Sequence, residues 1–132
     1  MNTELWDALH DGHIDRVDIE APNNLLLTLT VEALRNTLGR PEVIIRLIDC
    51  THAEWDSWDT PRGVTSADLE EIEVVCPHIL DAQAVDGSDT IKLSCDGGDL
   101  YLRYLDYEIW AGDDRVTLET ISDLTRRYWE NF

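Results

Sequence analysis

Lysine and long apolar runs are the first things this sequence lacks. Of its ten basic residues only Lys92 is a lysine, and the other nine are arginines. No stretch approaches the roughly 18 consecutive apolar residues of a membrane-spanning helix. The opening residues 1–4 lack the basic start and apolar core of a secretory signal peptide. These absences exclude a membrane span and favour a cytoplasmic protein with no membrane partner.

Cysteine is scarce as well. Three cysteines, Cys50, Cys76 and Cys95, are an odd number, which excludes a complete disulfide framework of the kind found in small secreted domains. We expect free thiols, which often serve as small buried apolar groups. The chain also has no Gly-x-Ser-x-Gly, phosphate-binding loop or dinucleotide fingerprint. The sequence therefore favours a protein that is not an enzyme, without deciding the point.

Acidic residues are what the sequence has in excess. Twenty-eight acidic side chains against ten basic ones give a net charge of −18 over 132 residues. A charge of this sign repels nucleic acid and anionic membranes and attracts basic proteins. Two interpretations remain open: the acidity serves recognition of a basic protein, or it serves only solubility or life in a high-salt host.

The predicted fold class is α+β, in a single globular domain that spans residues 1–132. The hydrophobic content of 43% and the five tryptophans oppose disorder. We predict a mostly antiparallel sheet, a meander of about six to eight strands. A short N-terminal helix and a C-terminal amphipathic helix packed on one face of the sheet complete the prediction.

The meander is predicted between residues 69 and 111. Residues alternate in polarity over 71–76 and again over 91–95, which is the period of half-buried strands. Asp96-Gly97-Gly98-Asp99 predicts a tight hairpin turn into a strand over 100–104, with the two central glycines supplying positive φ angles. Residues 86–89, Asp-Gly-Ser-Asp, predict a similar reversal one strand earlier.

Earlier strands are predicted on both sides of Pro22-Asn23-Asn24. Residues 13–21 and 25–31 form a predicted hairpin, whose first arm needs a bulge because its apolar residues change step. Residues 42–49 are apolar on both faces and predict a central strand, on which Arg46 needs a carboxylate partner if it is buried. Residues 51–64 predict a strand end followed by a long loop.

Helices are predicted at both ends of the chain. Residues 3–10 predict a short helix, and residues 32–38 predict one or two helical turns. The clearest helix begins after Thr117, whose side chain suits an N-cap. Its apolar residues recur at steps of three or four and form one stripe, made of Leu118, Ile121, Leu124, Tyr128 and Phe132.

Two Cys-x-His pairs raise a metal-binding or enzymatic alternative. Cys50 and His52 form one pair, and Cys76 and His78 form the other. Residues two apart in a strand share a face, so adjacent strands could bring two thiolates and two imidazoles to one tetrahedral zinc ion. The chain lacks the Cys-x-x-Cys spacing usual in structural zinc sites, and both cysteines end apolar runs where a buried thiol fits. Packing without a cofactor is therefore the favoured interpretation, and zinc the alternative.

A second candidate site surrounds two tryptophans in an acidic stretch. The predicted binding residues are Glu54, Trp55, Asp56, Trp58 and Asp59. An exposed aromatic residue flanked by carboxylates suits a basic protein partner, whereas the usual place of tryptophan is the core. We expect these residues to form a local acidic patch beside an exposed ring.

The function predicted from these features is protein binding. A small acidic protein can neutralise or regulate a basic partner, as immunity proteins, antitoxins and nucleic-acid mimics do. This association depends on size and charge alone. The rivals are the metal-binding or enzymatic domain at the Cys-x-His pairs and a structural domain whose acidity serves only solubility or a high-salt host.

Overall fold

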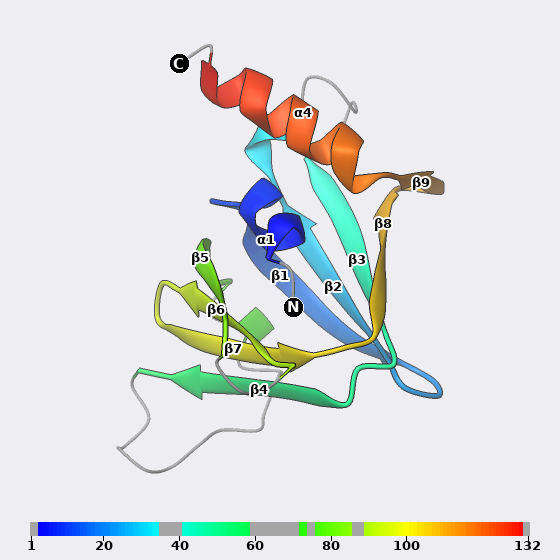
Figure 1. Cartoon of the computed structure of the whole chain (residues 1–132), viewed down its shortest axis with the longest axis vertical. Coiled ribbons are helices and arrows are strands. Elements are labelled where there is room, and N and C mark those ends of the chain that lie inside the picture. Colours follow the sequence, from blue (N-terminus) through cyan, green and yellow to red (C-terminus); the bar gives the residue numbers. More distant parts are fainter. Residues whose placement is uncertain (1–2, 35–40, 59–71, 74–75, 86–88, 131–132) are drawn as a thin grey trace.

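The computed structural model describes residues 3–34, 41–58, 72–73, 76–85 and 89–130. It confirms an α+β fold with antiparallel strands, a short N-terminal helix α1 (Glu4–Ala8) and a C-terminal helix α4 (Leu118–Glu130). Nine strands occur in the described residues, more than the six to eight expected, and they form two sheets instead of one (Figure 1).

The larger sheet, sheet A, has the strand order β1-β2-β3-β8-β9. Its strands are β1 (His13–Glu20), β2 (Asn24–Thr30), β3 (Glu42–Ile48), β8 (Asp106–Ala111) and β9 (Asp114–Val116). The hairpin around Pro22 is confirmed, and so is its bulge, because the β1–β2 register shifts between Ile14 and Arg16. The central place of β3 is also confirmed, since it pairs with β2 on one side and β8 on the other.

The smaller sheet, sheet B, has the order β4-β7-β6-β5. Its strands are β4 (His52–Ser57), β5 (Ile79–Ala84), β6 (Ile91–Cys95) and β7 (Gly98–Arg103). Residues 52–57, expected as a strand end, form a full strand of the sheet, and the loop expected over 59–64 lies outside the described residues. Residues 86–88 of the turn predicted over 86–89 also lie outside them, but β5 and β6 pair as a hairpin on either side of it.

The strand predicted over 71–76 is wrong where the structure describes it. Ile72 and Glu73 are helical, and the Cys76 amide donates to the Ile72 carbonyl at 2.8 Å, the i to i−4 bond of a helical turn. Residues 69–71 and 74–75 lie outside the described residues. The meander strand is instead β5, which begins after Pro77, because proline has no amide to contribute to a ladder.

The two sheets are joined at two places, and the strands of sheet B run across those of sheet A (Figure 1). At the first junction, β3 of sheet A continues into β4 of sheet B, and β7 of sheet B continues into β8 of sheet A. The paired strands β3 and β8 are therefore followed by the paired strands β4 and β7. Asp49, with φ of 51°, lies at the bend. Sheets packed across each other form such corners where strands pass from one sheet to the next.

The second junction links the start of β1 to the segment before β5. His13 and His78 form an isolated antiparallel bridge. The Ile14 amide donates to the Pro77 carbonyl at 3.0 Å, and the Asp11 amide donates to the Ile79 carbonyl at 2.9 Å. The inner faces of both sheets therefore close over one core.

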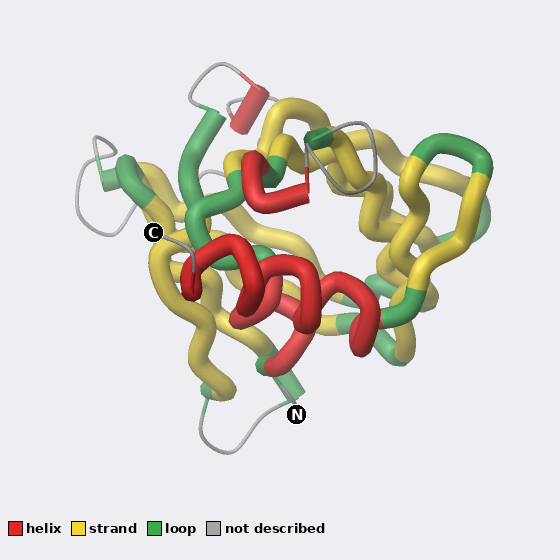
Figure 2. The backbone as a smooth tube through the Cα atoms, turned by 90° about the horizontal axis from the view of Figure 1, so that it is seen from above, coloured by secondary structure: helices red, strands yellow, loops and turns green. Residues whose placement is uncertain are grey.

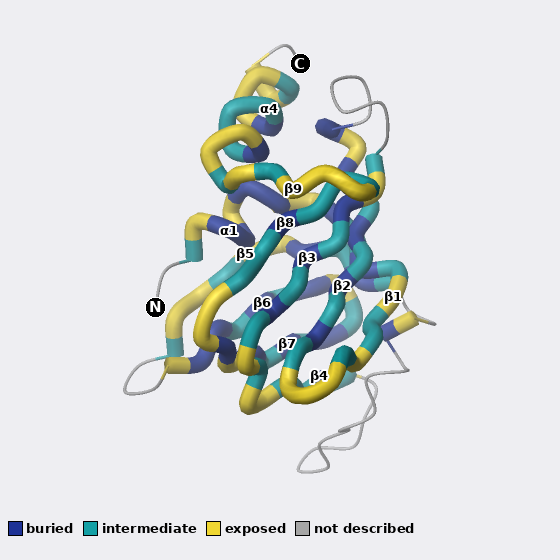
Figure 3. Tube along the Cα trace, turned by 90° about the vertical axis from the view of Figure 1, so that its right-hand side faces the viewer, coloured by how far each residue is buried: buried dark blue, intermediate teal, exposed yellow. Residues whose placement is uncertain are grey.

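Buried positions alternate with partly exposed ones along β2, β3, β6 and β7, as Figure 3 shows. Leu25, Leu27 and Leu29 of β2 are buried, as their alternation predicts. The Trp6 indole of α1 enters the same core and donates to the Tyr104 hydroxyl at 3.0 Å.

Helix α4 lies at one end of the molecule (Figure 1) and beside α1 (Figure 2). It also contacts the 3-10 turn η1 (Glu32–Leu34), which is the described part of the helical turns expected over 32–38. The Thr117 cap is confirmed, since its Oγ1 accepts from the Thr120 amide at 3.2 Å. Within the described chain, neither helix combines the length and apolar character that crossing a bilayer requires.

Candidate functional site

The predicted binding residues of β4 divide between the two faces of sheet B. Trp55 is fully buried, whereas Glu54 and Asp56 point to the outer face. The expectation of an exposed Trp55 is therefore wrong: strand alternation turns it inward, where it packs against Gly98. Trp58 follows the end of β4 and is 63% exposed. Asp59 lies outside the described residues.

The outer face of sheet B carries a row of carboxylates that runs across its strands. Asp56 of β4 stands directly opposite Asp99 of β7. Asp99 in turn faces Ser94 of β6, and Ser94 faces Asp81 of β5. We call Asp56, Asp99 and Asp81 the acidic row. Like charges placed directly opposite each other in a sheet are destabilising, so the row has an energetic cost in the isolated protein.

Trp58 lies at the same end of sheet B as this row. Its amide donates to the Gly97 carbonyl at 3.0 Å, which places it against the Asp96-Gly97 turn between β6 and β7. The ammonium group of Lys92 is 4.0 Å from one Asp99 oxygen. Arg103, at the far end of β7, donates to Thr90 at 3.1 Å. Carboxylates therefore gather at the Trp58 end, and the arginine of this face lies at the other.

The four residues of the zinc hypothesis are not assembled by the structure. The Cys50 thiol donates to the His52 carbonyl at 3.4 Å, and the His52 ring lies 3.1 Å from Glu54. The other pair stands in the segment before β5, where the Cys76 thiol donates to the Glu73 carbonyl at 3.3 Å. The two pairs belong to different neighbourhoods because β4 is paired with β7 and not with that segment. Among the described residues, no three or more His, Cys, Asp or Glu side chains gather as a metal site.

Two of the three thiols are also poorly suited to nucleophilic chemistry. Burial raises the pKa of Cys50. Burial, followed by the charges of Asp96 and Asp99, raises the pKa of Cys95 to about 12. The thiolate is the reactive form of cysteine, so Cys50 and Cys95 stay protonated and unreactive at neutral pH. All three cysteines are free.

The sequence analysis missed a histidine pair at the second sheet junction. The rings of His13 and His78 stand edge to face with their centroids 5.0 Å apart. Asp15 lies 3.2 Å from His13, and Asp96 lies 3.3 Å from His78. Both histidines line a pocket of about 280 Å³, together with His10, Tyr128 and Trp129. His13-x-Asp15 in a strand was the available signal, since residues two apart share a face.

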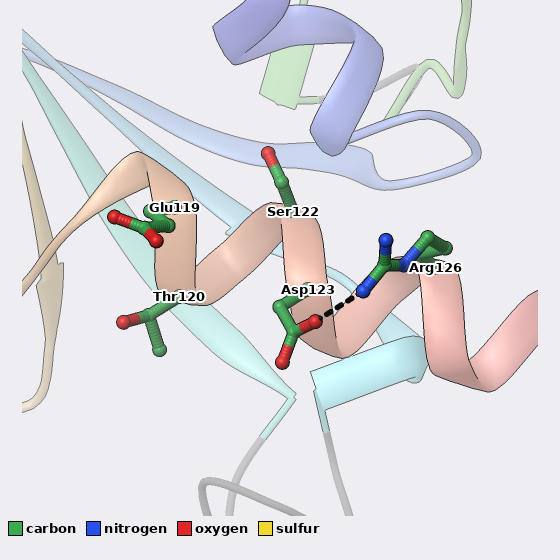
Figure 4. A pocket seen from close by; sticks show the side chains of 5 residues that line it. All are labelled: Glu119, Thr120, Ser122, Asp123 and Arg126. Atoms are coloured by element: carbon green, nitrogen blue, oxygen red, sulfur yellow. Dashed lines mark hydrogen bonds and ion pairs between the residues drawn. The ribbon is translucent and has the colours of Figure 1, made fainter.

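A larger hollow of about 550 Å³ lies beside α4, and its described lining comes from that helix alone (Figure 4). Arg126 points toward Asp123 and donates to it at 2.6 Å, so its charges already satisfy each other. The lining residues are Glu119, Thr120, Ser122, Asp123 and Arg126. Pairs at i and i+3 are ordinary features of a solvated helix surface, and we assign no site here.

Two surfaces therefore stand out among the described residues: the acidic row with Trp58, and the histidine pair. Comparisons of the chain with protein-family models, with curated proteins and with solved structures find no match.

Proposed function

We propose that this protein binds a basic protein partner at the Trp58 end of the outer face of sheet B. The proposal keeps the predicted class, a small acidic protein that neutralises or regulates a basic partner, and its cytoplasmic location. It keeps Glu54, Asp56 and Trp58 of the predicted site and adds Asp81 and Asp99 from neighbouring strands. Trp55 supports this surface from the core.

The observation that carries the proposal is the direct opposition of Asp56 and Asp99 beside an exposed tryptophan. An opposed pair of like charges destabilises the sheet that carries it. A lysine or arginine of a partner placed between the two carboxylates would convert this repulsion into attraction. Trp58 offers an apolar surface and a π face to the same cation.

The outer face of sheet A gives a useful contrast. There the charges of opposite sign are paired within the chain at shorter distances than Lys92 and Asp99 of sheet B, whose atoms are 4.0 Å apart. Arg46 contacts Glu108 at 3.1 Å and Glu20 at 3.2 Å, and Arg16 contacts Asp18 at 2.9 Å. These close pairs already offset the carboxylate charges of sheet A, so a basic partner gains less from this face than from the acidic row.

The proposal is tested with a fluorescein-labelled decapeptide of lysine and arginine, followed by fluorescence anisotropy at several salt concentrations. The probe tests the chemistry of recognition without requiring the natural partner. We compare the wild type with Trp58→Ala and with the double variant Asp56→Asn/Asp99→Asn. The matched control is Asp113→Asn/Asp114→Asn, which removes the same charge from two exposed residues at the β8–β9 turn.

We expect Trp58→Ala and the Asp56/Asp99 double variant each to weaken peptide binding by about tenfold, as loss of an interface anchor does. The control should change it less than about twofold. Binding should also weaken as salt rises, because exposed charges are screened. If both double variants weaken binding equally, the whole acidic surface attracts the peptide, and the solubility or high-salt interpretation replaces ours.

A further inference from the structure

The histidine pair has a second feature besides its ring contact: each ring is held by its own carboxylate. His13 Nε2 lies 3.2 Å from Asp15 Oδ1, and the Thr30 hydroxyl donates to the other oxygen of Asp15. His78 Nδ1 lies 3.3 Å from Asp96 Oδ2, while the His78 amide donates to Asp96 Oδ1. Both rings are therefore fixed from behind, by partners on β1, on β2 and in the β6–β7 turn.

These contacts decide which ring nitrogen stays available. A neutral imidazole that donates one N–H to a carboxylate keeps an acceptor lone pair on its other nitrogen. In His13 the available nitrogen is Nδ1, and in His78 it is Nε2. Histidines that ligate metals commonly have this arrangement, in which a carboxylate behind the ring fixes the tautomer and makes the ligating nitrogen more basic.

We propose that His13 and His78 together bind one late first-row divalent cation, with Zn²⁺ as the type case, through His13 Nδ1 and His78 Nε2. Imidazole nitrogen suits zinc, nickel and copper, and does not suit magnesium or calcium. This site shares only His78 with the set Cys50, His52, Cys76 and His78, which the structure does not assemble. It is also independent of the acidic row of sheet B.

The spacing of the two rings fits such an ion. With Zn–N bonds of about 2.0–2.1 Å and a tetrahedral angle, two bound imidazoles have their centroids about 5.2 Å apart. The observed separation is 5.0 Å. Side-chain exposures of 31% for His13 and 44% for His78 leave the pair accessible to an ion from solvent.

The electrostatic surroundings favour a divalent cation. Asp15 and Asp96 stand behind the rings, Asp11 and Glu32 line the same pocket, and the chain carries a net charge of −18. No third ligating side chain joins the pair among the described residues, so water completes the coordination. The ion would connect β1 to the segment before β5 and would strengthen the second junction of the two sheets.

The experiment uses untagged protein treated with chelator and kept reduced with a phosphine. Isothermal titration with ZnCl₂ or NiCl₂ at pH 7.5 measures affinity, and a thermal melt measures stabilisation. The matched control is His52→Ala, because His52 also has a carboxylate neighbour, Glu54, and is 43% exposed, but has no second imidazole facing it among the described residues. MgCl₂ serves as the ion control.

We expect one equivalent of Zn²⁺ to bind and to raise the melting temperature, because an ion that binds only the folded state stabilises it. His13→Ala and His78→Ala should each remove this binding, and His52→Ala should retain it. Asp96→Asn should lower the affinity about 10–100-fold, as loss of a supporting carboxylate does. Binding should weaken in acidic buffer, because protons compete with the metal for its ligands.

His13→Gln provides a second variant should the alanine variant fail to fold, and NMR of the wild type gives a readout without any substitution. Zn²⁺ should shift the ring resonances of His13 and His78 and leave those of His52 unchanged. Absence of binding at millimolar Zn²⁺ would overturn the proposal. So would binding that survives His13→Ala/His78→Ala and is lost in Cys50→Ser or Cys76→Ser, since thiols would then be the ligands.

Discussion

Gly98 leaves the space that the Trp55 indole occupies. A Cβ atom built on Gly98 would lie 2.7 Å from Cζ2 and 2.8 Å from Cη2 of Trp55, and 2.6 Å from the Asp56 carbonyl oxygen. The two residues belong to paired strands, β7 and β4, and both are buried. The indole thus fits under the sheet only because its neighbour has no side chain.

Gly98→Ala should therefore destabilise the protein by roughly 1–3 kcal/mol, the usual cost of forcing extra atoms into a packed core. Urea denaturation of the wild type and the variant measures this change. Adding Trp55→Leu to Gly98→Ala should recover part of the lost stability, because it removes the ring that the new Cβ would meet. The recovery is partial because the contact of that Cβ with the Asp56 carbonyl remains. A double-mutant cycle with no coupling between the two positions would contradict this account.

The hydrogen bond from Trp6 to Tyr104 gives a second prediction. Both residues are buried, so Tyr104→Phe should leave the indole N–H without an acceptor and should cost roughly 1–3 kcal/mol of folding free energy. Chemical denaturation provides the measurement. Tyr101→Phe is the control, since Tyr101 lies on the outer face of sheet B and should change stability by less than about 0.5 kcal/mol.

Stability should fall in alkaline solution because of Cys95. Its pKa is raised by burial from 9.0 to about 12 in the folded protein. Between these values the unfolded chain has lost the thiol proton and the folded protein still binds it, so stability decreases as pH rises. Tyr104, whose pKa is also raised by burial, adds a decrease of the same sign.

Urea denaturation from pH 9 to pH 10.5 should show wild-type stability falling by roughly 1–2 kcal/mol more than that of Cys95→Ala. The comparison concerns the slope with pH, so a constant cost of the alanine substitution does not affect it. Equal slopes for the two proteins would show that Cys95 is not the responsible group.

Helix α4 should be held chiefly by Ile121. Ile121 is fully buried, whereas Leu124 is only partly buried. We expect Ile121→Ala to cost roughly 2–5 kcal/mol and Leu124→Ala to cost less. Thermal or urea denaturation of the two variants checks the order. A larger effect at Leu124 would mean that the helix packs through a different stripe.

The parts of the fold that were predictable have a strong local pattern. Alternation identified β2 and β6, and an apolar run identified β3. The step in the first arm located the bulge near Ile14, and Thr117 marked the start of α4. The strand prediction around Ile72 was wrong because the alternation of apolar and acidic residues there fits a helical turn as readily as a strand. Division into two sheets could not be foreseen, since it depends on the bend at Asp49, which has no local sequence signal.

The candidate site was only half predictable for the same reason. The acidic stretch correctly pointed to an exposed tryptophan, Trp58, but the phase of β4 decided that Trp55 faces inward. Asp99 and Asp81 could not be assigned to the binding site from the sequence, because their place beside Asp56 depends on the strand order of sheet B. His13 and His78 are 65 positions apart in the sequence and meet only through the bridge between the sheets.

The corner between the sheets also imposes an order of assembly. β1, β2 and β3 are consecutive, so they can pair as soon as the first 48 residues are available. The second edge of β3 can pair only after β8 has been synthesised, and β4 can pair only after β7. Both of these partner strands come some 40 or more residues later in the chain. During synthesis the apolar edge of β3 is therefore open for seconds, at about 5–20 residues per second. Unpaired edges of this kind attract other strands, so we expect a nascent chain that pauses at this stage to be more prone to self-association.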